Sequence, residues 1–525
     1  MNDERFYLVR YEIRQIQNYI FQTSRIKSIK GGSLIVSNYL LEALKDVLDS
    51  FKLKHNLDDL VEKAKQMPIQ KILTTDFQEG NFRFYSDLDF QMAFFGGGSL
   101  HCIIKGEENA KKVSIALAKK LMKETGLLRV VYAYAELKGT ESFDDFENAR
   151  MEVDEKIRDV KLSMPKSNIA PALPFVYKDS ITGFPYTHFH FDNERKFHTT
   201  PEAFKDTRLS QYDFKMNPNE KFKIDELVDK GTDSYIAVMH IDGNNIGETI
   251  KILLEKKGER TTPEKAKKRK RTIFELMVKE SQELSKEIFK AFNSTAEDIL
   301  NDEKDGIPYK AVVNSGDDIT IIVKATDAFG FLQRYLRKLQ NNEKTYFSAC
   351  AGIAFVRSHF PFEVAYRIAE QCCDIAKADV KKDWERNKKA GHACAFSYYV
   401  VQGGMLSDVE SSRAAFGELE SQPYYVYKTE EHEKSDSLEW LLDRIDELKG
   451  KNPDLPLPRH AAKEIRGIYE QAYKKNSADY RKHVSFAEIN SRLPKGKHID
   501  AFLENKKPKY YDASVLMDFV ESKEE

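Results

Sequence analysis

The chain has 525 residues, of which 41% are hydrophobic, so it is a globular protein too long for one core, and three or four domains are expected. Its 83 lysines and arginines balance 84 aspartates and glutamates, which excludes recruitment of nucleic acid by overall charge. Five cysteines without a Cys-x-x-Cys pair exclude a disulfide framework and a zinc ribbon, and the lack of a signal-peptide pattern or a membrane-spanning apolar run predicts a cytoplasmic protein with no membrane contact.

The N-terminal part is predicted to alternate strands with helices. Apolar alternation predicts strands at 6–13 and 128–135 and a hairpin at 92–104. Helical spacing of apolar residues predicts helices at 15–22, 33–51, 110–125 and 141–162. We therefore expect a first α+β domain over residues 1–163.

Residues 164–230 are rich in proline, aromatic and polar residues and are predicted to form a linker domain. His188, His190 and His198 could be offered there as metal ligands, since a His-x-His pair faces one way on a strand. No further soft ligand is evident nearby in the sequence, so a surface or packing role is favoured.

The same order of elements returns after residue 230. A buried, β-branched strand at 235–241 delivers Asp242 to its carboxyl end, and a hairpin at 310–324 carries Asn-Ser-Gly-Asp-Asp at its tip. Further elements are predicted at 326–339, 346–355, 361–382 and 391–397. Two passages of strand, helix, hairpin, helix and strand predict an internal duplication of a βαββαβ unit.

The remaining segments are charged. A basic block at 265–271 can meet a phosphate backbone by releasing counterions, or it can be a solvated helix face balanced by neighbouring glutamates. Residues 405–525 are predicted to be helical, with helices at 438–448, 458–475 and 514–521.

Three aspartates come together in the second copy: Asp317 and Asp318 at the hairpin tip and Asp242 at the strand end. Uncompensated carboxylates at a sheet edge would repel one another and raise their own pKa values. A divalent cation removes that problem, and oxygen ligands suit Mg2+ or Mn2+. Gly316 lacks a Cβ, so a triphosphate could approach the backbone closely. Each motif alone could be an ordinary turn, but together at strand ends they favour a metal site.

Superposing the two copies places Glu12 opposite Asp242, and Gly96–Ser99 opposite Ser315–Asp318. The first copy has the hairpin glycines but lacks the paired carboxylates. It is therefore predicted to fold in the same way without holding metal in the same manner.

Asp242 at a strand end followed by the hairpin Ser315-Gly-Asp-Asp318 resembles the palm domain that GGDEF nucleotide cyclases share with the large polymerase-cyclase subunit of type III CRISPR effector complexes. The CRISPR subunit has Gly-Gly-Asp-Asp at the hairpin, whereas GGDEF cyclases would have Glu and Phe in place of Asp318 and Ile319. The CRISPR-type match is the closer one. Glu12–Phe21 resembles the same family's first palm, and 456–463 resembles the start of its C-terminal helical domain.

This resemblance implies an α+β fold with two ferredoxin-like (βαββαβ) palm domains at 1–163 and 231–404, a linker at 164–230 and a C-terminal helical domain at 405–525. The family's linker commonly binds zinc through cysteines around a Thr-Gly-x-Pro turn. Thr182–Pro185 keeps the turn, but the cysteines are missing, so no zinc site is expected. The sequence also has no His-Asp doublet, so the family's HD nuclease activity is not expected.

The implied function is that of a nucleotidyltransferase that makes cyclic or linear oligoadenylates from ATP in CRISPR-type antiviral defence. Asp242 and Asp317 would hold two Mg2+ or Mn2+ ions, assisted by Asp318 and a backbone carbonyl near Gly243, to activate a ribose hydroxyl and neutralise the leaving pyrophosphate. The residues expected to contact the nucleotide are Gly243, Asn244, Asn245, Ser315, Gly316 and Lys377. The partners implied are nucleotides, RNA and other subunits of an effector complex.

Two alternatives stay open at this point. In one, the site is silent and the protein is a scaffold or RNA-binding subunit, with Ser315 marking lost selection for catalysis. In the other, the enzyme makes a cyclic dinucleotide, as GGDEF cyclases do, which predicts a homodimer that brings two sites together.

Overall fold

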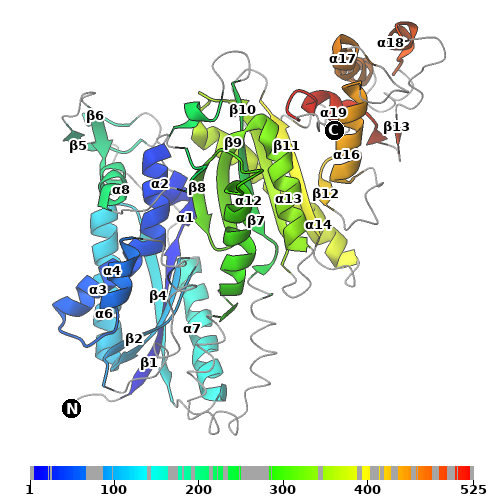
Figure 1. Ribbon diagram of the computed structural model, residues 1–525. Coiled ribbons are helices and arrows are strands. Elements are labelled where there is room, and N and C mark those ends of the chain that lie inside the picture. The colour runs from blue at the N-terminus through cyan, green and yellow to red at the C-terminus, as the bar shows by residue number, and fades with distance from the viewer. Residues whose placement is uncertain are drawn as a thin grey trace. The chain divides into compact units, whose positions relative to one another are not determined.

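The computed structural model describes most of the chain. The described residues are 5–21, 23, 26–66, 72, 87–96, 98–138, 143–163, 175–179, 183–190, 196–211, 217–221, 223–228, 234–246, 249, 283–284, 286–340, 347–386, 393–401, 409, 413, 419–426, 436–450, 457, 459–475, 484–493, 503–504 and 507–520. They belong to two compact units, Met1–Met216 with Asn245–Lys290, and Asn217–Asn244 with Ala291–Glu525. Each unit contains a main sheet and several helices, so the protein is of the mixed α+β class (Figure 1). The four domain boundaries expected from the sequence stay a prediction.

The first unit is built on a 4-stranded antiparallel sheet in the order β2-β3-β1-β4. The strands are β1 (Phe6–Arg14), β2 (Phe90–Gly96), β3 (Ser99–Lys105) and β4 (Arg129–Leu137). The helices are α1 (Ile16–Phe21), α2 (Ile26–Leu34), α3 (Leu40–Ser50), α4 (Asp58–Ala64), α6 (Glu107–Thr125), α7 (Phe143–Ser163) and α8 (Thr200–Gln211). The predicted strands and hairpin are confirmed. The predicted helix at 33–51 is instead divided by a π-helical turn, Ile35–Tyr39, between α2 and α3.

Helix α7 covers one face of this sheet. Leu8, Ile103 and Val131 of the strands share a buried cluster with Val153 and Ile157 of α7. Residues two apart on a strand face the same side, so the even-numbered residues of β1 lie on the α7 face.

The second unit is built on a 6-stranded sheet in the order β12-β11-β10-β7-β9-β8. The strands are β7 (Tyr235–Gly243), β8 (Tyr309–Ser315), β9 (Asp318–Lys324), β10 (Ala349–Arg357), β11 (Cys394–Val400) and β12 (Tyr424–Val426). β10 and β11 are parallel, and the other neighbours are antiparallel. The main helices beside the sheet are α12 (Thr295–Leu300), α13 (Ala328–Gln340) and α14 (Phe362–Arg386). Within this unit, β7 continues two residues beyond the predicted end and so includes Asp242.

Helices cover both faces of the second sheet. On one face, Cys350 and Ala395 share a buried cluster with Cys373 of α14. On the other face, the ring of Phe329 in α13 lies 5.7 Å from the ring of Phe355. Alternate residues of β7 and β10 therefore face α14, and the residues between them face α13.

The C-terminal part of the second unit is mainly helical. It contains α16 (Leu438–Leu448), α17 (Arg459–Lys475), α18 (Ala487–Ser491), α19 (Tyr511–Leu516) and a short hairpin, β13 (Leu503–Glu504) with β14 (Lys507–Pro508). The prediction for α16 is confirmed. The bounds predicted for the last helix, 514–521, were wrong, because α19 begins earlier and buries Asp512 in its first turn. None of the helices in the described ranges is long and apolar enough to cross a membrane.

The region predicted as a linker contains β5 (Tyr186–His190), β6 (Lys196–Thr199) and α8. His188 is exposed, whereas His198 is buried with its Nδ1 4.0 Å from Oδ2 of Asp206 in α8. The side chain of His190, the turn residue Thr182 and the basic block 265–271 lie outside the described residues.

A buried carboxylate joins α19 to the edge of the second sheet, and its removal should be costly. Asp512 accepts hydrogen bonds from the hydroxyls of Tyr398 (2.6 Å) and Tyr424 (2.7 Å) and from the backbone N–H of Ser421 (2.6 Å). We expect Asp512→Ala to lower the free energy of unfolding by about 3 kcal/mol, because three buried donors lose their acceptor. Asp518→Ala, which removes an exposed carboxylate beside Arg459, should cost under about 1 kcal/mol. Urea denaturation of both variants tests this; equal losses would contradict it.

Candidate active site

The strand register of the second sheet brings the three predicted aspartates together. β7 and β9 are antiparallel neighbours, and Asp242 and Asp318 are directly opposite each other. Asp317 lies in the turn before Asp318, and its carbonyl accepts a hydrogen bond of 3.2 Å from the backbone N–H of Gly243. The two chain segments, far apart in sequence, thus meet at one end of the sheet.

A lysine from α14 neutralises part of this charge. Asp242 lies on the face of β7 that is covered by α14, and its Oδ2 forms an ion pair with Nζ of Lys377. The Lys377 side chain is 28% exposed and the Asp242 side chain 36% exposed, so solvent or a ligand can reach both. Although burial alone would lower the pKa of Lys377, the charge and hydrogen bond of Asp242 raise this pKa above its ordinary value.

The third aspartate has a strongly shifted titration. Burial, followed by the negative charges of Asp242 and Asp318, raises the pKa of Asp317 from 3.8 to about 6. The groups that surround it offer carboxylate and backbone oxygens, which are the ligands that Mg2+ and Mn2+ prefer. Among the described residues, no group of three or more Asp, Glu, His or Cys side chains is already arranged around a metal position. The oxygen donors at this end of the sheet nevertheless suit a hard divalent cation by type, and its charge would offset the repulsion that raises the pKa of Asp317.

The shifted pKa of Asp317 predicts a pH-dependent stability of the metal-free protein. The folded protein keeps a proton on this carboxyl at pH values where the unfolded chain has already released it. The contribution of Asp317 to the free energy of unfolding therefore falls as the pH rises from 3.8 to about 6. We expect Asp317→Asn to flatten that part of the stability profile, measured by urea denaturation in EDTA. A variant profile parallel to that of wild type would contradict the assignment.

The other residues expected at the nucleotide differ in their surroundings. The buried side chain of Asn244 donates hydrogen bonds to Oγ of Ser348 (3.0 Å) and the carbonyl of Ala393 (3.1 Å), so it ties the end of β7 to neighbouring segments. Asn245 is exposed and has a φ of 50°. Gly316 has a φ of 66°, and a Cβ there would meet nothing within 4 Å, so the space above the turn is open. The side chain of Ser315 lies outside the described part.

A second group of residues at the site was not expected from the sequence. His240, two residues before Asp242, is buried, and its Nδ1 lies 3.4 Å from Oδ1 of Asp318. Burial lowers the pKa of His240 and raises that of Glu370 in α14. The spacing of two residues along a strand was a usable signal for His240, whereas nothing local pointed to Glu370.

The first sheet carries a comparable pair in the same register. Glu12 is directly opposite Ser99, as Asp242 is opposite Asp318. Oε1 of Glu12 forms an ion pair with Lys161 near the end of α7, and Oε2 lies 3.1 Å from NH2 of Arg10. Glu12 thus has two cationic neighbours, and Ser99 offers a hydroxyl where the second sheet has a carboxylate.

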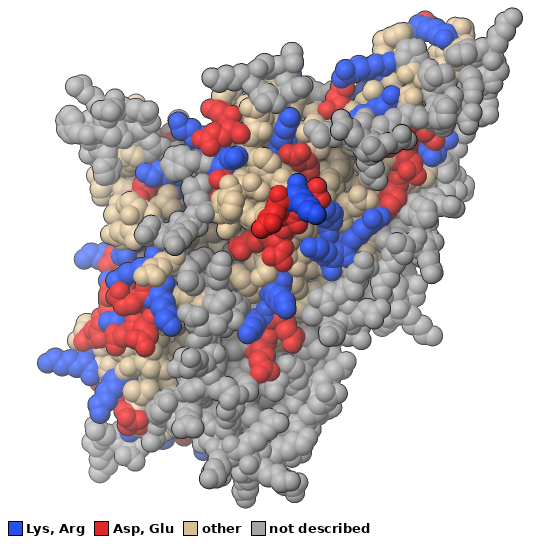
Figure 2. All heavy atoms as spheres, viewed as in Figure 1, with Lys and Arg blue, Asp and Glu red and all other residues tan. Residues whose placement is uncertain are grey.

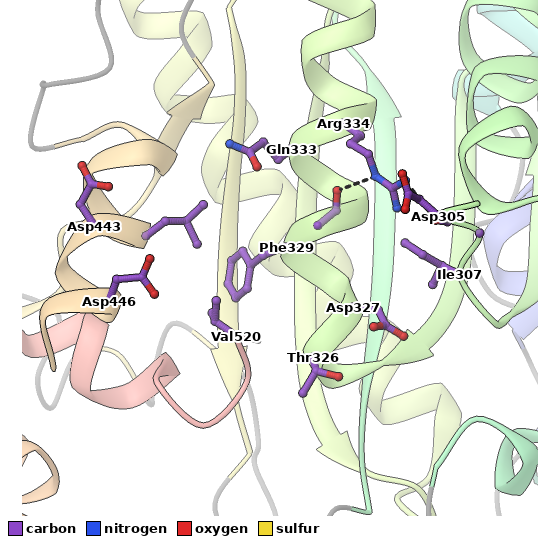
Figure 3. A pocket seen from close by; sticks show the side chains of 13 residues that line it. Asp305, Ile307, Thr326, Asp327, Phe329, Gln333, Arg334, Asp443, Asp446 and Val520 are labelled. Carbon is purple, nitrogen blue, oxygen red and sulfur yellow. Dashed lines mark hydrogen bonds between the residues drawn. The ribbon is translucent and has the colours of Figure 1, made fainter. Parts of the chain in front are cut away.

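A cavity of about 360 Å3 lies elsewhere in the second unit. It is lined by residues of α13 and α16, with Asp443 and Asp446 on one side, Arg334 on the other and the ring of Phe329 between them (Figure 3). Arg334 donates to the carbonyls of Gly330 (3.2 Å) and Asp305 (3.1 Å). None of the predicted site residues lines this cavity.

The face of the molecule in Figure 2 shows acidic and basic side chains intermixed, in keeping with the balanced composition.

The part of the chain that contains Asp242, Asp317 and Asp318 matches a known protein family. Residues 235–385 match the family described as Cas10/Cmr2, second palm domain. No curated protein matches the chain significantly.

Several solved structures share the fold over nearly the whole chain. A Csm1–Csm4 cassette in complex with one ATP has a TM-score of 0.51 and 15% identity, covering 99% of this chain and 70% of that chain. The cassette in complex with pppApA has a TM-score of 0.50 and 15% identity, covering 98% and 69%. The apo cassette has a TM-score of 0.50 and 15% identity, covering 98% and 70%. At this identity the likeness is one of fold.

Proposed function

From the premise that residues 235–385 form a second palm domain of the Cas10/Cmr2 kind, we propose that this protein is a metal-dependent nucleotidyltransferase that joins ATP into linear or cyclic oligoadenylates in CRISPR-type antiviral defence. The observation that carries the proposal is the register of β7 and β9, which pairs Asp242 with Asp318 and leaves Asp317 in the adjoining turn. The fold shared with cassettes that bind ATP and pppApA supports the choice of adenine nucleotides.

Asp242, Asp317 and Asp318 are the residues that would hold the metal. Two Mg2+ or Mn2+ ions bound there would supply the charge that lowers the pKa of a ribose hydroxyl and neutralises the leaving pyrophosphate. The protein contributes by fixing the three carboxylates on two hydrogen-bonded strands, so that their positions are set before substrate binds.

Lys377 and Gly316 would receive the phosphates of ATP. The Lys377 ammonium pairs with Asp242 and is still partly exposed, so it can turn towards a phosphate oxygen once a cation occupies the aspartates. The open space above Gly316 would let phosphate groups approach the turn. Asn244 would shape the site through Ser348, and Asn245 would contact the nucleotide from its exposed position.

The topology supports a finer proposal for the fold. The strand order β2-β3-β1-β4 of the first sheet matches the order β8-β9-β7-β10 within the second sheet. We propose that both are ferredoxin-like palms, over 1–163 and 231–404, of which only the second is catalytic. A subunit like Csm4 would be a partner in an effector complex, since the similar structures are Csm1–Csm4 cassettes. RNA is a further proposed partner that rests on the family resemblance alone.

The second candidate function is a silent scaffold. The Asp242–Lys377 ion pair favours it, because the site already neutralises one of its carboxylates with the chain's own cation.

The test is to incubate the purified protein with each labelled nucleoside triphosphate and Mg2+ or Mn2+, beside the Asp317→Ala/Asp318→Ala double variant, and to identify products by mass spectrometry. A product formed from ATP by wild type alone is the expected result, and its mass gives the ring size. Silence with all four nucleotides, also after addition of RNA and candidate partner subunits, would leave the scaffold as the better account.

A further inference from the structure

A buried histidine lies directly behind the candidate metal ligands. His240 is 4% exposed and shares the α14 face of β7 with Asp242. Its Nδ1 lies 3.4 Å from Oδ1 of Asp318 and 3.3 Å from Oγ1 of Thr320, and both neighbours belong to β9. The imidazole therefore touches one of the three carboxylates from the protein interior, on the side away from solvent.

The surrounding elements hold this ring in place. The ring of Tyr366 in α14 meets it edge-on, with the centroids 5.4 Å apart. On β10 the residue opposite His240 is Gly352, where an added Cβ would come within 1.8 Å of the carbonyl oxygen of Ala369. The backbone of α14 thus lies close against the sheet beside the imidazole, which leaves His240 little room to move.

The contact also distinguishes the two oxygens of Asp318. Oδ1 is buried, and its 3.4 Å contact with Nδ1 of His240 does not have hydrogen-bond geometry, whereas the Asp318 side chain as a whole is 27% exposed. The exposure of this side chain therefore comes from atoms other than Oδ1. When one carboxylate oxygen packs against an interior side chain, the other oxygen stays directed at the site and the group rotates less between its two orientations.

We propose that His240 is a positioning residue that packs against Oδ1 of Asp318 from the interior and so presents Oδ2 to the metal site. This inference rests on the proposed function, because it assigns His240 a role only if Asp318 helps to hold a cation. Nothing in it requires His240 to touch substrate or to exchange a proton.

The test compares His240→Leu with His240→Asn in the full-length protein. Asparagine keeps a donor near the position of Nδ1, whereas leucine fills the space without one. The readout is Mn2+ affinity, measured by the electron paramagnetic resonance signal of free Mn2+ during titration, without nucleotide. We expect His240→Leu to weaken Mn2+ binding about 10- to 100-fold, and His240→Asn to retain most of the affinity.

His101→Leu is the matched control, since it makes the same substitution in β3 of the first sheet and should leave Mn2+ affinity unchanged. Thermal unfolding of all variants separates lost folding from lost positioning. Wild-type affinity in a folded His240→Leu protein would overturn the inference while leaving the proposed function intact, as would equal losses in the leucine and asparagine variants. Absence of Mn2+ binding by wild type would overturn both.

Discussion

Asp242→Asn is expected to form nucleotide product from ATP at least about 1,000-fold more slowly than wild type. Asp242 is the one carboxylate of the three that comes from β7. It lies opposite Asp318 in the strand register, and it forms an ion pair with Lys377 of α14. An amide keeps the size of the side chain but removes the charge that a divalent cation and the lysine both require. The measurement is the initial rate of product formation at saturating Mg2+, with Mn2+ affinity as a second readout.

Glu12→Gln is the matched control for this prediction. It makes the same change from carboxylate to amide at the corresponding register position of the first sheet, opposite Ser99. Because Glu12 pairs with Arg10 and Lys161 and has no second carboxylate opposite it, we expect the variant to keep Mn2+ affinity within a factor of about two. Equal loss of Mn2+ affinity in both variants would show that the first sheet also holds metal.

Gly352→Ala is expected to destabilise the second unit by about 3 kcal/mol or more. The added Cβ would lie 1.8 Å from the carbonyl oxygen of Ala369 and 2.4 Å from the backbone nitrogen of Cys373, so α14 would have to move away from β10. Since α14 also carries Lys377, the shift should loosen the ion pair with Asp242 and reduce activity at temperatures where the variant is still folded. Chemical denaturation monitored by circular dichroism measures the first effect.

The control for that prediction is Gly467→Ala in α17 of the same unit. A Cβ at Gly467 meets nothing within 4 Å, and alanine favours a helix interior over glycine. This variant should be as stable as wild type or up to about 1 kcal/mol more stable. If both glycine variants behaved alike, the close approach of α14 to β10 would not be a determinant of stability.

The sequence predicted most of the elements that frame the site. The strand that ends at Asp242 and the hairpin around Gly316 were predicted because alternation, β-branched residues and turn glycines act over a few neighbouring positions. The same local rules missed the π-helical turn at Ile35–Tyr39 and misplaced the bounds of α19. Both segments make contacts with residues distant in sequence: Asn38 in the π-helical turn donates to the carbonyl of Ala64, and Asp512 in α19 accepts from Tyr398 and Tyr424.

By itself, the sequence determined that three aspartates stand at a strand end and a hairpin tip, and that two copies of one order of elements occur. Only the tertiary structure decided which side chains those aspartates meet. Lys377 reaches Asp242 across 135 positions because α14 packs closely on β10 at Gly352, and His240 meets Asp318 because β7 and β9 are paired in that register. The buried side chain of Asn244 donates a hydrogen bond to Ser348, and this contact too depends on how distant segments pack. Such contacts depend on how elements pack against one another, and the local periodicity of a sequence does not encode that packing.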